Sequence, residues 1–389
     1  MRIAIDIRKI NEFGIGTYIW NLVRNIAALD RRNDYLLIGT QRNFHELGPL
    51  PPNFKQHYES EDSSFLRNNW ALPLTLRRES VDLLHVPHHN VPWFVPTRLL
   101  VTVHDCAHLL YPDENTSRLE TWRIYLGTKR VIKKADHVIA VSKSTKNDLM
   151  NFFNIDLSRV SVIYNALDER FNINTTAEDQ HSVLERYQIK DPFVLYSGRI
   201  RSHKNVHRLI EAFAVLKSEL DNEQYRNLKL IIIGDELSKH QYLRLTVIRS
   251  GVQQDVRFFG FVPYPVLRVF YQTAALFAFP SLYEGFGLPP LEAMANRAPV
   301  LASNTSSLPE VLGDAALLVN PENVFEIARG MKWILSDEDG RNALIAKGLA
   351  QVLKFSWQVA AKRVIETYER LCGAKPLAAE SMASVDSPK

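Results

Sequence analysis

The sequence has few of the features that mark secreted, membrane-spanning or nucleic-acid-binding proteins. Its 389 residues include only two cysteines, Cys106 and Cys372, which form no recognisable disulfide framework and favour a reducing compartment. No apolar run approaches the roughly 18–20 residues of a membrane span, and the opening MRIAIDIRK lacks a signal peptide's apolar core. The formal net charge of +4 suits phosphate-bearing substrates or an anionic surface but is too small to indicate nucleic acid. We therefore expect a cytoplasmic protein.

A complete dinucleotide-binding fingerprint is also missing. Gly14 and Gly16 supply only half of it, Ile19 stands where the third glycine would fall, and the pair does not directly follow a strand. This argues against a nicotinamide-dependent dehydrogenase. We expect instead a glycine loop at the edge of a cleft between domains, close to a phosphate or an acceptor.

Four histidines lie near two predicted strand ends without a metal-binding pattern. His85 and His104 end apolar strands, and His88 and His89 follow in a loop. Ligands of open α/β sheets collect at the carboxyl ends of strands, so His104 is a candidate polar contact to substrate, with loop or core filling as the alternative for each histidine. The spacing matches no zinc site, and no helix pairs a carboxylate with histidine, so we expect no metal.

Apolar strands alternate with amphipathic helices throughout, which predicts an α/β protein with two doubly wound parallel sheets. With 46% hydrophobic residues, the chain can build two cores. The predicted strands are residues 3–7, 35–39, 81–86, 99–103, 135–141 and 160–164 in the first half, and 193–196, 228–234, 256–259, 276–279 and 300–302 in the second.

The polar stretch 168–191 is the best candidate for a linker. We therefore expect an N-terminal domain over residues 1–170 and a C-terminal domain over 171–356. The Ala/Ser/Pro-containing tail, 374–389, is expected to be disordered. No solenoid repeat is present.

The stretch 279–310 carries the most specific chemistry. A buried strand turns at Pro280, passes a loop with Gly285 and Gly287, and enters a helix at Leu288-Pro289-Pro290, where proline suits the first turn. Glycine lets the backbone approach a ligand, and a helix start presents N–H groups to phosphate oxygens. Glu284 and Glu292 would repel phosphate but accept hydrogen bonds from hydroxyls. Together these features indicate a nucleotide sugar; the alternative is a tight turn with two solvated acids.

A basic helix is predicted over residues 118–134, with cations interleaved among Trp122, Ile124, Tyr125 and Leu126. A solvated helix is the simplest interpretation. Contact with anionic lipid headgroups is the alternative.

The order of these motifs resembles that of retaining glycosyltransferases of the GT-B fold, specifically glycosyltransferase family 4. The similarity covers about residues 1–372. The N-terminal half resembles bacterial members that include mannosyltransferases of surface-polysaccharide biosynthesis. The segments that carry the resemblance are IAIDIRKINEFGIGTYIWNL, Thr102-Val103-His104-Asp105, Ser197-Gly198-Arg199 with Lys204-Asn205, Gly234-Asp235, Phe259-Gly260-Phe261-Val262, and Pro280 through Glu292 as the family's E-x7-E motif.

The resemblance implies a role for each matching residue. Arg199 and Lys204 would neutralise the donor diphosphate as electrostatic catalysts, Glu284 would contact the donor sugar, and Glu292 would hold the ribose. His104 would face the acceptor and the donor sugar from the other domain. The remaining implied donor-binding residues are Gly14, Gly16, Gly198, Gly260, Phe261, Val262, Gly285, Phe286, Gly287 and Leu288. Asn205, where a small residue is usual, and the second proline, Pro290, depart mildly from the pattern.

The resemblance further implies front-face transfer with retained configuration, no cofactor and no metal, and a C-terminal helix over 357–372 that packs back on the first domain. GDP-mannose is the leading donor and UDP-sugars come next. The acceptor could be a lipid-linked glycan, a growing polysaccharide or a small molecule. A nucleotide-sugar 2-epimerase and a non-catalytic sugar-nucleotide binding protein remain rival interpretations.

Overall fold

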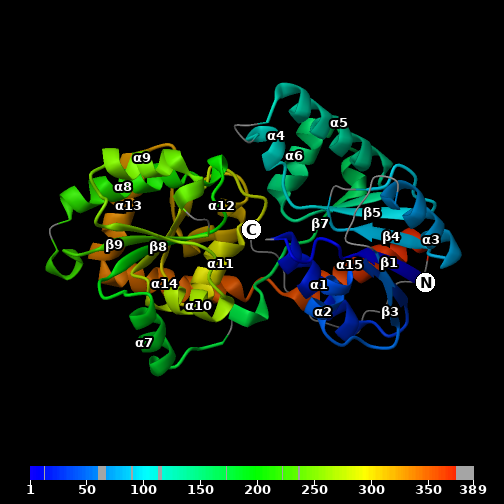
Figure 1. Ribbon diagram of the computed structural model, residues 1–389, viewed down its shortest axis with the longest axis horizontal. Coiled ribbons are helices and arrows are strands. Elements are labelled where there is room, and N and C mark those ends of the chain that lie inside the picture. Colours follow the sequence, from blue (N-terminus) through cyan, green and yellow to red (C-terminus); the bar gives the residue numbers. More distant parts are fainter. Residues whose placement is uncertain are drawn as a thin grey trace.

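Two parallel β-sheets lie side by side in the computed structural model (Figure 1). The structure describes residues 1–12, 14–59, 67–88, 91–112, 116–171, 173–220, 222–234 and 237–373. His89, Asp235 and the predicted tail 374–389 lie outside the described residues. The predicted fold class, two Rossmann-like α/β units, is confirmed.

The first sheet has seven parallel strands in the order β3-β2-β1-β4-β5-β6-β7. Their apolar residues are buried on both faces, as is typical of parallel strands covered by helices. The strands are β1 (Arg2–Asp6), β2 (Asp34–Gly39), β3 (Phe54–Tyr58), β4 (Leu83–Val86), β5 (Arg98–Val103), β6 (His137–Ala140) and β7 (Val160–Val162). The helices are α1 (Ile15–Leu29), α2 (Gln41–Leu47), α3 (Leu72–Arg78), α4 (Ala107–Leu110), α5 (Arg118–Lys134) and α6 (Lys143–Phe153).

The second sheet has six parallel strands in the order β10-β9-β8-β11-β12-β13. Its strands are β8 (Phe193–Ser197), β9 (Lys229–Ile233), β10 (Val256–Phe259), β11 (Leu276–Phe279), β12 (Val300–Ser303) and β13 (Leu317–Val319). Its helices are α7 (Ala177–Arg186), α8 (Val206–Glu219), α9 (Gln241–Arg249), α10 (Tyr264–Thr273), α11 (Leu288–Ala295), α12 (Leu308–Leu312), α13 (Val324–Ser336) and α14 (Glu338–Val352). The strand order reverses between β8 and β11, so the loops after these two strands flank the position where such sheets bind ligands.

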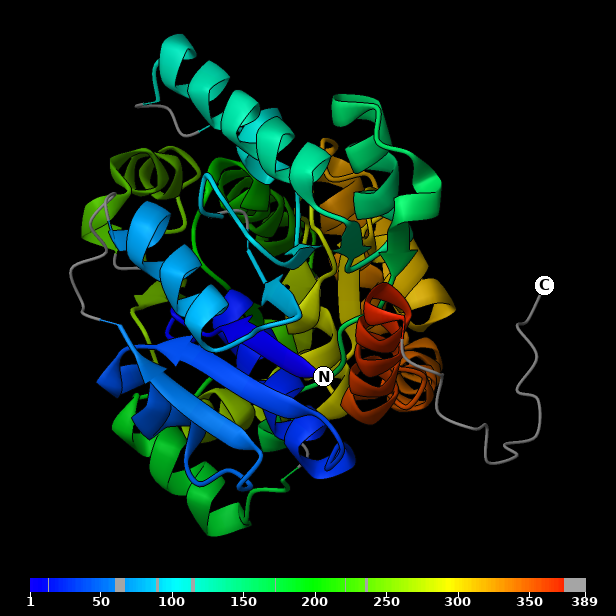
Figure 2. The same ribbon diagram turned by 90° about the vertical axis from the view of Figure 1, so that its right-hand side faces the viewer.

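The last helix, α15 (Trp357–Cys372), leaves the second unit and packs against the first (Figure 2). Its buried face, which includes Trp357 and Tyr368, joins the same core cluster as α1 and β1. The Tyr368 hydroxyl lies 2.7 Å from Nδ1 of His85 on β4. This helix therefore ties the end of the described chain to the first sheet.

The strands β3 and β13 were not predicted, and a helix lies in the stretch that was predicted to be a linker. β3, with sequence FKQHY, is an edge strand with polar residues, and β13 has only three residues. β3 lacks the apolar run that marks a buried strand, whereas β13 ends the apolar run from Ala315 to Val319, which was overlooked. The predicted linker stretch contains α7, which packs on α10.

Loops after the strands of both sheets meet at the interface between the two units. The Tyr283 hydroxyl donates to Oδ2 of Asp148 at 2.6 Å and accepts from the backbone N–H of Cys106 at 3.0 Å. Glu310 on α12 accepts from the Lys143 N–H at the start of α6, at 2.8 Å, where the helix dipole favours a carboxylate. The carboxyl ends of the two sheets therefore face each other.

No helix in the described ranges combines the length and the apolarity that crossing a membrane requires.

Candidate active site

Lys204 and Glu284 form an ion pair beside the point where the strand order reverses, between β8 and β11. Lys204 follows β8 and Glu284 follows β11, and the Lys204 Nζ lies 2.6 and 2.7 Å from the two carboxylate oxygens. The Lys204 and Glu284 side chains are only 18% and 9% exposed. Partial burial strengthens this attraction, so each side chain fixes the other in place. The pair places opposite charges side by side where the strand order reverses.

Asn205 explains the conformation of the loop that carries Lys204. Its φ of 60° is left-handed, which asparagine tolerates better than most residues. Its side-chain amide donates to the carbonyl oxygens of Pro280 at 2.9 Å and Pro321 at 2.7 Å. The departure from a small residue at this position therefore adds two buried hydrogen bonds.

The loop that carries Glu284 is held by two serines that follow β12. The Glu284 N–H donates to Ser306 Oγ at 2.9 Å, and Ser307 Oγ donates to the carbonyl oxygens of Glu284 and Phe286, both at 3.0 Å. Gly287 has a φ of 100°, and a Cβ there would lie 2.6 Å from Leu308 Cδ2. The acid therefore stands on a braced turn that other residues could not easily form.

Gly285 lies directly against the backbone of the other unit. A Cβ added there would lie 1.8 Å from the carbonyl oxygen of His104 and 2.9 Å from the Cβ of Asp105. Thr145 Oγ1, on α6, donates to the Gly285 carbonyl at 3.2 Å. The loop of the second unit thus rests directly on the loop after β5.

His104 lies beside this contact as a neutral, oriented ring. Its Nε2 lies 3.1 Å from the Pro87 carbonyl oxygen, and Tyr18 meets it edge-on at 4.8 Å between ring centroids. Burial lowers the pKa of His104 to about 4, an effect that the Asp105 carboxylate partly opposes. A neutral imidazole can form hydrogen bonds to substrate hydroxyls without adding charge.

His85 lies near the end of β4, as predicted, and takes the core-filling role that the sequence left open. Its side chain is fully buried between Thr102 Oγ1, at 2.9 Å from Nε2, and the Tyr368 hydroxyl. Burial lowers the pKa of His85 to about 3. The ring is a satisfied core histidine that joins β4, β5 and α15.

Glu292 lies on α11 in a partly buried position. Its Oε2 accepts from the Tyr271 hydroxyl at 2.9 Å. Burial raises the pKa of Glu292 to about 7; the Tyr271 hydrogen bond and the Arg170 guanidinium partly oppose that rise, and the Asp168 carboxylate adds to it. Glu292 is therefore close to half ionised at neutral pH.

We predict that Glu292 gives the fold a distinctive pH dependence. Its pKa is about 7 when folded and 4.5 when unfolded, so between these values the folded state binds more protons. The free energy of unfolding should therefore decrease as pH rises from about 4.5 to about 7. Glu292→Gln should abolish this pH dependence, whereas the control Glu185→Gln, at an exposed glutamate, should retain it. Thermal midpoints measured across this pH range test both variants. If the Glu292→Gln midpoints keep the wild-type slope, the buried-carboxylate interpretation is wrong.

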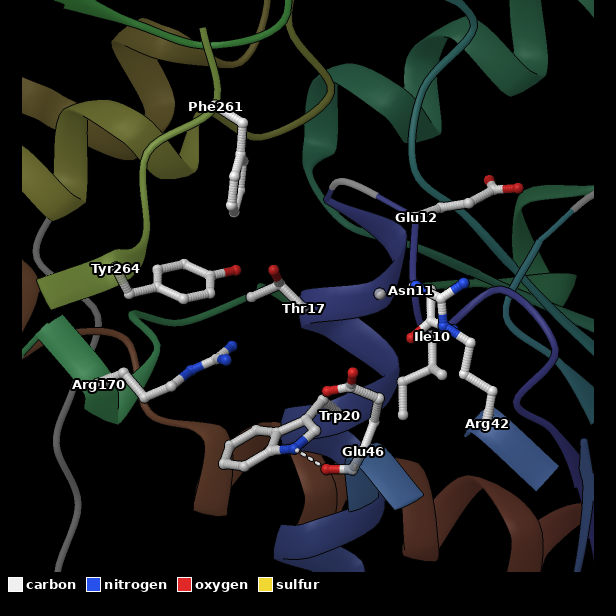
Figure 3. Close-up of a pocket in the computed structure, with 11 residues that line it drawn as sticks. Ile10, Asn11, Glu12, Thr17, Trp20, Arg42, Glu46, Arg170, Phe261 and Tyr264 are labelled. Carbon is white, nitrogen blue, oxygen red and sulfur yellow. Dashed lines mark hydrogen bonds between the residues drawn. The ribbon is translucent and has the colours of Figure 1, made fainter. Parts of the chain in front are cut away.

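A pocket of about 250 Å³ opens between the two units (Figure 3). Arg170 projects into it, with its guanidinium 4.1 Å from the centroid of Tyr264 and 4.8 Å from the centroid of Trp20. The Asp168 carboxylate pairs with Arg170 and fixes its orientation. The lining residues are Ile10, Asn11, Glu12, Gly16, Thr17, Trp20, Arg42, Glu46, Arg170, Phe261 and Tyr264.

The other predicted donor-binding residues divide into exposed and buried groups. Arg199 is exposed after β8, and within the described ranges no carboxylate pairs with it. Phe261 is 67% exposed in the pocket wall, whereas Val262 and Phe286 are buried in the core. The last two could therefore face a ligand only through their backbone. The remaining positions are Gly14 at the start of α1, Gly16 in the pocket wall, Gly198 after β8, Gly260 after β10, and Leu288 at the start of α11.

Several residues of the interface were not predicted from the sequence. Arg170, Tyr264 and Trp20 stack together although they are far apart in the chain. Tyr271 and Tyr283 bond to acids on other elements. A single sequence gives no signal for such pairs. Among the described residues, no group of three or more His, Cys, Asp or Glu side chains is arranged to hold a metal ion.

Comparison with known families covers both halves of the chain. The model of "Glycosyltransferase Family 4" matches residues 14–171, and that of "Glycosyl transferases group 1" matches residues 179–351. The chain belongs to glycosyltransferase family 4. Its fold agrees: sucrose-phosphate synthase from Thermosynechococcus elongatus superposes with a TM-score of 0.77 at 20% identity, over 96% of this chain and all of the other. The predicted GT-B architecture is therefore confirmed.

Curated relatives of this family 4 glycosyltransferase include enzymes named for mannose transfer. Serotype-specific mannosyltransferase WbdA of Escherichia coli is 34% identical over 287 residues, which cover 74% of this chain. The matched part spans only 34% of WbdA, about a third of its length. O-antigen chain mannosyltransferase B of Escherichia coli is 29% identical over 92% of this chain and 96% of its own.

Proposed function

We propose that this family 4 glycosyltransferase moves a hexose, mannose from GDP-mannose, to a glycan or lipid-linked glycan with retention of configuration. The observation that carries the proposal is the Lys204–Glu284 pair, which joins a cation suited to diphosphate and an acid suited to sugar hydroxyls. The names of the mannosyltransferase relatives support the choice of sugar. A UDP-sugar donor is the second candidate.

In the proposed reaction, chain residues supply electrostatic stabilisation. The bond between the anomeric carbon and the diphosphate breaks through an oxocarbenium-like transition state, and negative charge develops on the leaving phosphate. Lys204 and Arg199 stabilise that charge, and the phosphate accepts the proton of the attacking acceptor hydroxyl on the same face. Glu284 and neutral His104 orient the sugar, Glu292 accepts from the ribose hydroxyls, and no metal or cofactor takes part.

A panel of GDP- and UDP-sugars tests this assignment. Calorimetric binding and product formation with a mannan-type oligosaccharide acceptor should both favour GDP-mannose, and the new glycosidic bond should have the anomeric configuration of the donor. An inverted product would contradict the retaining mechanism. A UDP-sugar preference would contradict the donor. Donor binding without any transfer or hydrolysis would favour a non-catalytic binding protein, and release of an epimerised sugar would favour a 2-epimerase.

We further propose that the enzyme works on the cytoplasmic side of an anionic membrane, against which α5 docks. Leu119, Trp122 and Leu126 form a helical stripe, and they are 66%, 58% and 40% exposed. The stripe continues through Arg130 and Lys134, which cover the rings of Trp93 and Phe94 respectively. Exposed aromatic residues beside cations suit the headgroup layer of an anionic bilayer.

Vesicle sedimentation tests this surface. The protein should bind vesicles that contain phosphatidylglycerol and not vesicles of phosphatidylcholine alone. Replacing exposed Arg118 and Arg123 with alanine should weaken binding by about 1 kcal/mol each. Phe325→Ala, which removes a 62% exposed ring from α13, is the control and should bind as wild type. Equal binding to both vesicle types would contradict the proposed surface.

A further inference from the structure

The proposed reaction uses none of the four charged side chains that line the pocket between the two units, Glu12, Arg42, Glu46 and Arg170. Arg42 and Glu46 lie four residues apart on α2, and both line the pocket from the first unit (Figure 3). This spacing places them on the same side of the helix. Within the described part of the chain, neither side chain forms an ion pair, so both are available to a ligand.

The helix that carries them is held firmly against α1. The Trp20 indole N–H donates to the Glu46 carbonyl oxygen at 3.1 Å, and Arg24 Nη1 donates to the Leu47 carbonyl oxygen at 2.9 Å. Thr40 and Asn43 form a reciprocal capping box at the start of α2. The helix that carries the two charges is therefore held in place across the pocket from Phe261 and Tyr264.

A nucleotide whose ribose is held by Glu292 would place its nucleobase in this pocket. Tyr264 lines the pocket and begins α10, the helix whose Tyr271 donates to the Glu292 carboxylate at 2.9 Å. A base is joined directly to its ribose, so it must lie within a few ångströms of that position. The exposed ring of Phe261 offers an apolar surface on which a base can stack.

The charges of the pocket suit guanine better than uracil. Guanine carries two adjacent donors, N1–H and the N2 amino group, which a carboxylate can accept together. Its O6 and N7 are paired acceptors for an arginine. Uracil offers a single ring N–H between two carbonyl oxygens, which leaves one carboxylate oxygen without a partner.

We infer that this pocket receives the nucleobase of the donor, and that Glu46 and Arg42 recognise guanine from the opposite side of the cleft. Glu46 accepts from N1–H and the amino group, and Arg42 donates to the acceptor edge. The first unit thereby selects the base, although the second unit holds the ribose and the phosphates. This inference rests on the proposed function, since it requires a nucleotide donor in the cleft.

Calorimetric titration of the full chain with GDP and with UDP tests this recognition without any acceptor. Wild type should prefer GDP. Glu46→Gln and Arg42→Ala should each lower GDP affinity about tenfold and leave UDP affinity nearly unchanged, which follows from the loss of one bidentate contact. Glu178→Gln, at an exposed carboxylate on α7 outside the pocket, is the matched control and should behave as wild type.

The outcomes separate this inference from the proposed function. If wild type binds neither nucleotide, the proposed function and this inference both fail. If wild type prefers GDP and the two variants keep that preference, only this inference is overturned. If wild type prefers UDP, this inference and the proposed GDP-mannose donor both fail. If the variants lose affinity for GDP and UDP equally, the two charges do not distinguish the bases and this inference alone is overturned.

Discussion

Replacing Lys204 with alanine should lower kcat/KM for the donor by about 100- to 1000-fold. That range is typical of removing one group that stabilises an oxyanion in a transition state, about 2.7–4 kcal/mol. The Lys204 side chain is 18% exposed, and its ammonium group contacts both carboxylate oxygens of Glu284. Its loss removes the positive charge that faces the leaving group and also leaves Glu284 without its counterion. Steady-state kinetics with GDP-mannose measure the effect.

Two further variants give this prediction a control and a discriminating test. Lys204→Arg keeps the charge and should recover part of the activity, whereas Lys190→Ala, at an exposed lysine outside the cleft, should keep all of it. Thermal midpoints of the variants exclude unfolding as the cause of the loss. Near-normal turnover of Lys204→Ala with donor bound would show that the lysine does not stabilise the leaving group.

Gly285→Ala should lower turnover by about 100-fold, because the added methyl group forces the two units apart where their backbones touch. The added Cβ would lie 1.8 Å from the carbonyl oxygen of His104. The Cβ is bonded directly to the backbone of its loop, and the carbonyl oxygen is part of the backbone of the other, so no side-chain rotation can relieve the overlap. A displacement near 1 Å between reacting groups can cost about two orders of magnitude in rate.

The matched control is Gly127→Ala on α5, where an added Cβ meets nothing within 4 Å. Alanine favours a helix over glycine by roughly 1 kcal/mol, so this variant should be active and slightly more stable. In Gly285→Ala, nucleotide affinity should fall less than turnover, since Lys204 and Glu292 both lie on the second unit. Wild-type turnover of Gly285→Ala with a soluble acceptor would mean that the contact with His104 is not needed for the reaction.

The apolar runs of the sequence were sufficient to predict most of the fold. Buried strands such as β9 and β11 consist almost entirely of apolar residues, and their order along the chain indicated two parallel sheets. The short β13 ends the apolar run from Ala315 to Val319 and was overlooked. The edge strand β3 lacks such a run, and α7 is a polar helix without buried residues. Pattern-based reasoning misses elements of this kind because their stability depends on neighbours distant in sequence.

For the candidate site, the sequence indicated which residues matter but not how they pair. Lys204 and Glu284 were assigned to different parts of a donor, and the structure shows that the two side chains also bind each other. His85 and His104 both follow apolar runs near strand ends, and the sequence left core filling open for each; the ring of His85 points into the core toward Tyr368. Strand position fixes the edge of the sheet that a residue occupies. It does not fix the face toward which the side chain points when both faces are covered by helices.

The ion pair also has a consequence for donor binding. An anionic diphosphate that approaches Lys204 competes with Glu284 for the same ammonium, so the two must share it or separate. Sugar hydroxyls that donate to Glu284 can replace the lost contact. This exchange would favour ligands that carry both a diphosphate and a sugar over a diphosphate alone.

A crystal structure of the protein with GDP-mannose tests the central claim most directly. We expect the diphosphate to lie against Arg199 and Lys204 and the ribose to bind Glu292. The sugar should lie at Glu284, beside His104. A well-ordered donor bound outside the cleft, with these side chains unchanged, would contradict this claim.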